Sequence, residues 1–146
     1  MLKIFSFSLV FLSIYNFAQV GSDAILGKWI STDKNVAVNV YKEGNSFQAK
    51  IIWFDDTLGS GKPMNTQVDS ENPNPQLRNR KILGMDVLEN LSYNGSKNRW
   101  ENGKIYDASS GRTWDSFAEM LSNGYLKVRG FWKFKWIGKT LTFKKL

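Results

Sequence analysis

Residues 36–53 read VAVNVYKEGNSFQAKIIW, and this stretch decides the expected fold. Every second residue of 36–40 is valine, and every second residue of 47–53 is apolar. Between them, residues 43–45 (Glu-Gly-Asn) have the composition of a tight turn. A period of two places alternate side chains on opposite faces of a strand, so the stretch predicts a β-hairpin with one apolar face.

The same alternation continues along the rest of the chain. Further strands are expected at 25–32, 83–93, 100–107, 112–121, 126–136 and 137–144, with turns at 94–95, 109–111, 123–124 and Gly138. The result is an all-β chain of about eight sequential antiparallel strands. Such a series favours an up-and-down β-barrel, because closure removes the exposed strand edges; a β-sandwich is the alternative.

One connection differs from the others. Residues 55–81, between the third and fourth strands, are polar and hold all three prolines. Loops of this length are uncommon in compact domains and are often functional. Gly59-Ser60-Gly61-Lys62 lacks the spacing of a phosphate-binding P-loop, since Asp56 and Pro63 occupy the positions that need Gly and Ser/Thr.

The chain of 146 residues has no cysteine and no histidine. These absences exclude Ser-His-Asp and thiol catalysis, disulfides, and metal sites built from thiolate or imidazole ligands. We therefore expect no metal and no cofactor, and the sequence assigns no reaction. The aromatic content of 14% is enough for a hydrophobic core in a single domain.

The first eighteen residues have the pattern of a secretory signal peptide. Lys3 is followed by an apolar run from Ile4 to Tyr15, and Ala18 precedes the expected cleavage site. We therefore expect residues 1–18 to be removed and residues 19–146 to form one exported domain, periplasmic or secreted. The run is too short to indicate a membrane span, so an integral membrane protein is not expected.

Charged residues suggest two further interpretations. Asp115 and Glu119 would share one face of a strand with Asp107 across a turn, which is compatible with a carboxylate-based hydrolase, although solvated or ion-paired carboxylates are the simpler interpretation. The formal charge is +7, and the chain after Glu119 carries seven basic residues and no acid. Lys127, Arg129 and other bases would share one strand face, which suits an anionic lipid or glycan.

Several segments together resemble the DUF2147 family of exported, lipocalin-like bacterial proteins of unknown function. They are GKW (27–29), IIW (51–53), NPNPQLRNRKILG (72–84), WENGKIYDASSGRTW (100–114), LKVRGF (126–131) and GKTLTF (138–143). Ala108, Trp114 and Phe143 depart from the usual family residues. The resemblance implies a lipocalin-like or fatty-acid-binding-protein-like barrel in which Trp29 closes one end and a basic side chain, here expected to be Arg129, packs over it.

A binding set follows from this expected barrel. Aromatic residues of the strands would line a cavity, and the arginines of the stiff, proline-containing segment would clamp a carboxylate or phosphate at its mouth, or pair with Asp107 or Asp115 to hold the loop on the barrel. The expected ligand-binding residues are Trp53, Arg78, Arg80, Trp100, Tyr106, Asp107, Trp114 and Arg129.

The leading hypothesis is a barrel that binds a small, partly apolar or anionic ligand. The alternatives are an interaction module that uses the basic C-terminal strands and, third, the carboxylate-based hydrolase. Nucleic acid is not an expected partner of an exported protein, and a monomer or weak dimer is expected.

Overall fold

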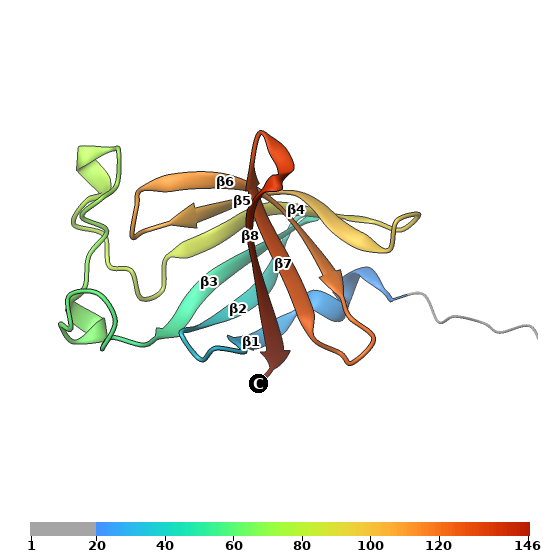
Figure 1. The fold of residues 1–146 in the computed structure, drawn as a ribbon, viewed down its shortest axis with the longest axis horizontal. Coiled ribbons are helices and arrows are strands. Elements are labelled where there is room, and N and C mark those ends of the chain that lie inside the picture. Colours follow the sequence, from blue (N-terminus) through green and yellow to red (C-terminus); the bar gives the residue numbers. More distant parts are fainter. Residues whose placement is uncertain (1–19) are drawn as a thin grey trace, which may run out of the picture.

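Eight antiparallel strands, hydrogen-bonded in sequence order, close into a barrel (Figure 1). The computed structural model describes residues 20–146, apart from the side chain of Trp136; the expected signal peptide lies outside the described residues. The strands are β1 Gly27–Ser31, β2 Val36–Glu43, β3 Ser46–Phe54, β4 Asp86–Asn94, β5 Arg99–Asp107, β6 Arg112–Met120, β7 Leu126–Trp132 and β8 Phe134–Lys145. The barrel predicted from the alternation is confirmed, and the β-sandwich alternative is wrong.

Three short 3-10 turns complete the elements. They are Ser22–Ile25 before β1, and Met64–Thr66 and Pro75–Leu77 within the long loop between β3 and β4. The predicted position of this loop is therefore confirmed. Between residues 20 and 146, no helix has the length and apolar character needed to cross a membrane.

The apolar core fills one end of the barrel. Trp29 and Trp100 are almost fully buried there, and each indole N–H has a partner in the N-terminal segment: Trp29 donates to the Ile25 carbonyl at 2.8 Å and Trp100 to the Ser22 carbonyl at 3.0 Å. A buried Trp usually needs a partner for this N–H. The 3-10 turn before β1 therefore closes this end, which we call the closed end.

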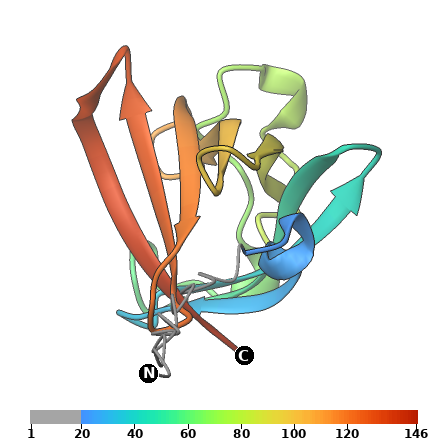
Figure 2. The ribbon, with the colours of Figure 1, turned by 90° about the vertical axis from the view of Figure 1, so that its right-hand side faces the viewer.

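Side-chain exposure rises along the barrel axis. On the inward-facing side of β8, Phe143 is 6% exposed, Leu141 is half-buried and Lys139 is exposed. Figure 2 shows β2 and β3 opposite β7 and β8 across the barrel. The core thus ends before the strands do, and the other end, where the long loop lies, is open.

One predicted boundary is wrong. The expected turn at Gly138 lies at Lys133, which adopts a left-handed φ of 61° between β7 and β8. Gly138 instead lies within β8, where a Cβ atom would be 2.0 Å from the Gly130 carbonyl oxygen. Glycine is therefore needed at 138 for close approach of two strands and not for a turn.

Candidate functional site

The candidate site is the open end of the barrel, which we call the mouth. A bulge in β3 places Trp53 opposite Ala37, on the outer face of the barrel, which corrects the expected inward position of Trp53, whereas the Ile105–Trp114 pair of β5 and β6 lies on the inward side. Gly130 of β7 lies against this pair: a Cβ atom at position 130 would be 3.7 Å from Trp114 Cβ and 3.8 Å from Ile105 Cδ1. One aromatic side chain, one aliphatic side chain and a glycine therefore form part of the mouth wall.

One lysine gives the mouth a positive charge. Lys139 is opposite Gly130 in the β7–β8 register, on the same side as the buried pair Leu126 and Phe143. It is exposed, and it makes no ion pair with any residue between 20 and 146. A cation beside apolar walls, close to Asp107 but not ion-paired with it, is suited to the polar head of an anionic ligand.

Asp107 stands at the rim of the mouth, but its carboxylate is occupied. It accepts hydrogen bonds from the Ser109 amide at 2.9 Å and from the Ser109 and Ser110 hydroxyls at 2.6 and 2.8 Å. Burial raises the pKa of Asp107, but these hydrogen bonds and the charge of Lys139 lower it, and the net shift is downward. Asp107 therefore stabilises the β5–β6 turn, and a ligand-binding role for it stays a prediction.

Tyr106 and Arg80 belong to a different structure, a latch that holds the long loop. Asp69 of the loop is fully buried and accepts hydrogen bonds from Tyr106 Oη at 2.6 Å, Arg80 Nη2 at 2.8 Å and Asn72 Nδ2 at 2.8 Å. Burial raises the pKa of Asp69, but these three donors lower it, and the net shift is downward. Burial, followed by the hydrogen bond to Asp69, raises the pKa of Tyr106 to about 12.

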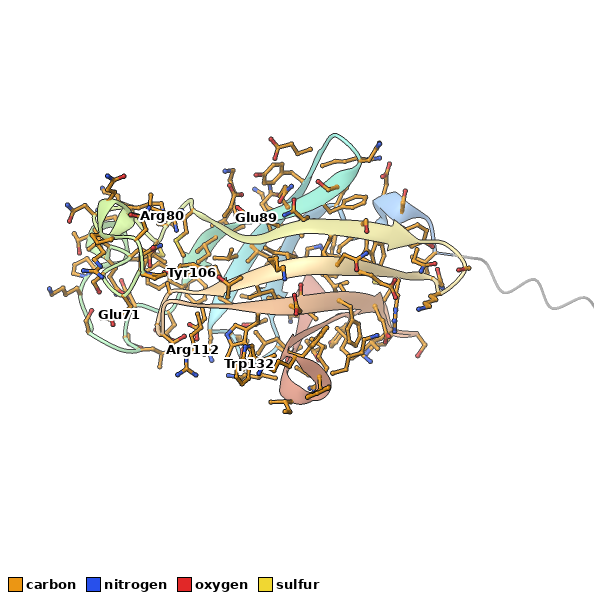
Figure 3. All side chains as sticks on the ribbon, turned by 90° about the horizontal axis from the view of Figure 1, so that it is seen from above. Glu71, Arg80, Glu89, Tyr106, Arg112 and Trp132 are labelled. Atoms are coloured by element: carbon orange, nitrogen blue, oxygen red, sulfur yellow. The ribbon has the colours of Figure 1, made fainter. Side chains whose placement is uncertain are left out.

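A backbone contact strengthens the latch. Gly111 in the β5–β6 turn has a φ of 69°, as its expected turn role requires, and a Cβ atom there would be 2.1 Å from the Glu71 carbonyl oxygen. Figure 3 shows Glu71, Arg80, Tyr106 and Arg112 together at this end of the molecule. The loop is therefore seated directly on the β5–β6 turn.

The expected pairing of the arginines is wrong. Arg78 and Arg80 do not contact Asp107 or Asp115: Arg80 pairs with Asp69, and Arg78 Nε donates to the Asn72 carbonyl at 2.8 Å. Both arginines therefore bind the loop's own residues, and Arg80 does so because the buried Asp69 carboxylate needs a cationic partner. The hydrogen bond that joins the loop to the barrel comes instead from Tyr106 to Asp69.

Two other expected residues lie away from the mouth. Trp100 is fully buried in the core of the closed end. Arg129 is not the base over Trp29, which corrects that expectation: Lys145 Nζ lies 4.6 Å from the Trp29 ring. Arg129 instead donates to the Lys135 carbonyl at 2.8 Å and to Thr140 Oγ1 at 2.9 Å.

The outer wall carries the remaining carboxylates of interest. Asp115 pairs with Lys104, and Glu119 pairs with Lys127 at 2.7 Å, while the register places Asp107 on the opposite face of the sheet. The three acids considered for a hydrolase are therefore each engaged, and they do not share one face. Lys127 and Arg129 of the expected basic face both lie on this wall, whereas Lys139, from the next strand, lies in the mouth.

Glu101 is the strongly shifted carboxylate of this wall. Hydrogen bonds from Asn94 at 3.0 Å and Arg99 at 2.6 Å lower its pKa to about 2, against a smaller opposing effect of burial. Arg99 lies on the same strand as Glu101 and Asn94 lies on the adjacent strand β4, which indicates that Glu101 has a structural role.

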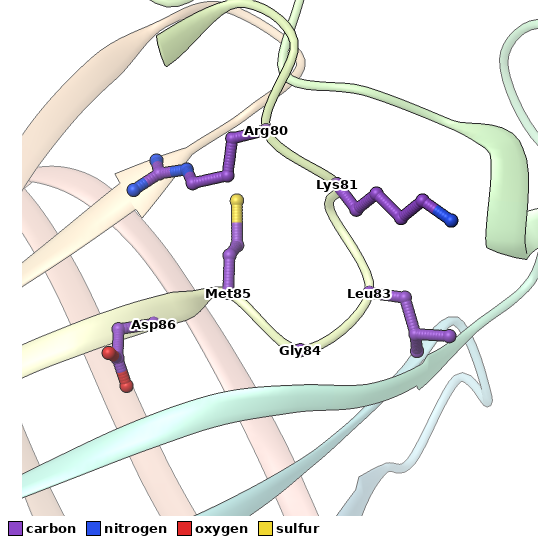
Figure 4. A pocket seen from close by; sticks show the side chains of 6 residues that line it. All are labelled: Arg80, Lys81, Leu83, Gly84, Met85 and Asp86. Atoms are coloured by element: carbon purple, nitrogen blue, oxygen red, sulfur yellow. The ribbon is translucent and has the colours of Figure 1, made fainter.

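Two hollows of the described part of the chain lie away from Trp114 and Lys139. One, of about 390 Å³, lies where the loop returns to β4 and is lined by Arg80, Lys81, Leu83, Gly84, Met85 and Asp86 (Figure 4). The other, of about 380 Å³, lies on the outer wall beside Phe117 and Phe131.

Of the expected aromatic residues Trp114 lies on the inward side of the mouth, whereas Lys139, Gly130 and Asp69 were not expected from the sequence. With the turn placed at Gly138, Lys139 could not be assigned to the inward face. Asp69 carried no signal, because it is a single acid in a polar loop whose burial depends on a tyrosine 37 positions away.

The comparisons with known proteins agree with this fold. A solved structure described as "Protein HP1028 from the human pathogen Helicobacter pylori belongs to the lipocalin family" is similar, with a TM-score of 0.70 and 29% sequence identity over 83% of this chain and 82% of that chain. No curated protein matches the chain. The family described as "Uncharacterized protein conserved in bacteria (DUF2147)" matches residues 27–145. The chain therefore belongs to the DUF2147 family, as its sequence segments suggested.

Proposed function

We propose that the protein binds a small, partly apolar anion in the mouth of the barrel. The observation that carries this proposal is the combination of a partly exposed inward-facing tryptophan with a lysine that makes no ion pair among residues 20–146. Trp114 and Ile105 supply apolar contact area, and Lys139 supplies the charge. The floor for such a ligand is the buried core of the closed end.

The fold supports this class of function. Eight-stranded barrels are just wide enough to hold one small ligand or to be filled by side chains. Here the closed end is filled and the mouth is not, so the ligand's apolar part would contact the inward-facing strand residues while its head remains at the rim. Similarity to a protein described as a lipocalin is consistent with this arrangement.

A pair of matched probes tests the proposal. Dodecanoate and dodecanol have the same chain and differ in charge, and each is titrated against a fluorescent anionic probe, anilinonaphthalenesulfonate, bound to the protein. We expect dodecanoate to displace the probe at lower concentration. Lys139→Met should remove about fivefold to tenfold of this preference, since a charge-assisted contact contributes roughly 1 kcal/mol or more. Lys62→Met, on the exposed long loop, is the matched control.

A second variant tests the location. Gly130→Leu places a branched side chain in the mouth, where the Cβ position has only ordinary contacts. We expect it to weaken binding of both probes while the barrel still folds. Unchanged binding in Gly130→Leu and in Lys139→Met together would show that ligands bind elsewhere or not at all.

We further propose that this binding takes place outside the cytoplasm. Support comes from the basic, apolar and small-residue pattern of residues 1–18. N-terminal sequencing of the protein recovered from its own cells tests it, and a chain that begins at Gln19 is expected. Recovery of a chain that still begins at Met1 would contradict the proposal.

A further inference from the structure

The turn between β7 and β8 carries two strongly exposed aromatic side chains. Trp132 is 56% exposed and Phe134 is 55% exposed, and Ile137 close by is 37% exposed. Figure 3 shows Trp132 at the periphery of the molecule. Large apolar side chains that stay this exposed and lie together commonly mark an interaction site.

This hairpin projects beyond the barrel wall. The β1–β8 ladder that closes the barrel pairs only residues 29–31 with 143–145, so the part of β8 before Thr142 extends past β1 (Figure 1). The turn at Lys133 lies at the same end as the long loop and the β5–β6 turn. The hairpin is therefore part of the rim of the mouth, and its tip extends outward from the barrel.

The charge of the hairpin indicates the kind of partner. From Arg129 to Lys139 the sequence RGFWKFKWIGK contains one arginine, three lysines and no acid. Lys133 Nζ lies 4.7 Å from the Trp132 ring, so cation and aromatic are presented side by side. Trp with adjacent Lys is the composition found where proteins meet the membrane interface, because the ring enters the headgroup layer while the ammonium binds phosphate.

We propose that the β7–β8 hairpin tip, residues 132–137, docks on an anionic lipid surface. Trp132 and Phe134 enter the headgroup region, and Lys133 contacts lipid phosphates. Because the tip belongs to the rim, docking brings the mouth of the barrel to the bilayer. This inference does not depend on ligand binding in the mouth.

Vesicle flotation tests the proposal with the full chain. Phosphatidylglycerol vesicles should bind the protein more tightly than phosphatidylcholine vesicles. Trp132→Ala should weaken binding to phosphatidylglycerol roughly tenfold, since it removes a large apolar side chain from the interface. Lys133→Gln should weaken it about fivefold, and salt at about 0.5 M should weaken wild-type binding as well.

Matched variants at the opposite end serve as controls. Leu146 is 63% exposed and Lys97 has a side chain that is 59% exposed, both at the closed end. Leu146→Ala and Lys97→Gln should bind vesicles as wild type does. All variants share residues 1–19, so differences among them report on the substituted positions alone.

A local readout accompanies flotation. Brominated phosphatidylglycerol should quench the tryptophan emission of the wild type, and the quench should be smaller in Trp132→Phe. Flotation and quenching are measured without dodecanoate, which separates this result from the test of the mouth.

Several outcomes would overturn the proposal. Equal binding to the two vesicle types would overturn it, and so would binding of Trp132→Ala as tight as that of the wild type. Binding to heparin with which vesicles do not compete would instead assign the tip to an acidic glycan. A wild-type dimer that Trp132→Ala converts to a monomer, without vesicle binding, would instead assign the tip to a second copy of the chain.

Discussion

Removing one hydroxyl from the latch tests how the long loop is held. Tyr106→Phe deletes the 2.6 Å hydrogen bond to Asp69, a carboxylate with no solvent exposure. Hydrogen bonds to charged groups contribute about 1.5–3 kcal/mol, and a buried acceptor that loses its donor incurs the full desolvation cost. Asp69 keeps Arg80 and Asn72, so we expect the loss to fall on the opening of the loop and not on the barrel.

Amide hydrogen exchange measures that opening directly. The Asp69 amide donates to the Arg80 carbonyl at 2.8 Å and the Ile82 amide donates to the Gln67 carbonyl at 3.1 Å; both bonds join two segments of the loop, and they break when the loop opens around Asp69. An opening free energy lowered by about 1.5–3 kcal/mol accelerates exchange about 10- to 100-fold.

A second tyrosine provides the matched control for this prediction. No hydrogen bond of the Tyr125 hydroxyl is found within the described part of the chain, so Tyr125→Phe should leave loop exchange unchanged. If the two variants behave alike, the hydrogen bond to Asp69 does not hold the loop. If amides in the core strands accelerate as much as those in the loop, the bond stabilises the whole barrel and the latch interpretation is refuted.

Three further predictions concern stability. Gly111→Ala should lower the free energy of unfolding in urea by at least about 1–2 kcal/mol, because alanine disfavours a left-handed φ and its Cβ atom would overlap the Glu71 carbonyl. An unchanged free energy of unfolding would refute this contact. Gly130→Ala should raise that free energy by about 0.5–1 kcal/mol, because its Cβ atom meets only ordinary contacts, whereas Gly138→Ala should lower it, because its Cβ atom would overlap the Gly130 carbonyl. Thermal unfolding of the two variants measures this, and a less stable Gly130→Ala than Gly138→Ala would contradict the prediction. Glu101 has a pKa of about 2 in the folded protein against its usual 4.5, so its ionised form stabilises the fold at pH values above 4.5, and this contribution is lost as the pH falls toward 2. Glu101→Gln should therefore make the free energy of unfolding depend less on pH between 4.5 and about 2. An unchanged pH dependence would contradict the lowered pKa.

The strands could be predicted from the sequence because alternation is a local signal. Valine at every second position of 36–40 is enough to give both the strand and its inward face. The turn at Lys133 could not be predicted in this way, because Trp132-Lys133-Phe134 continues the alternation and contains no Gly, Asn or Pro. Lys133 takes the left-handed conformation because barrel closure fixes where the two strands must pair.

The candidate site depends on pairings across the fold, which single-sequence patterns do not contain. Trp114 could be proposed because large aromatics on inward-facing positions are expected in a barrel. Lys145 over Trp29 follows from the register of the last strand against the first, and the burial of Asp69 follows from the seat of the long loop on Tyr106. Neither follows from residue type or spacing.

Closure by the first and last strands sets the order in which the chain can fold. The ladder that seals the barrel joins Ser31 to Phe143 and Trp29 to Lys145, so it cannot form until the final residues have been synthesised. Pairings this distant in sequence form slowly, because a loop of nearly the whole chain must close first. The sealed barrel therefore forms only after translation is complete, whereas the hairpins between neighbouring strands can form while the chain is still being made.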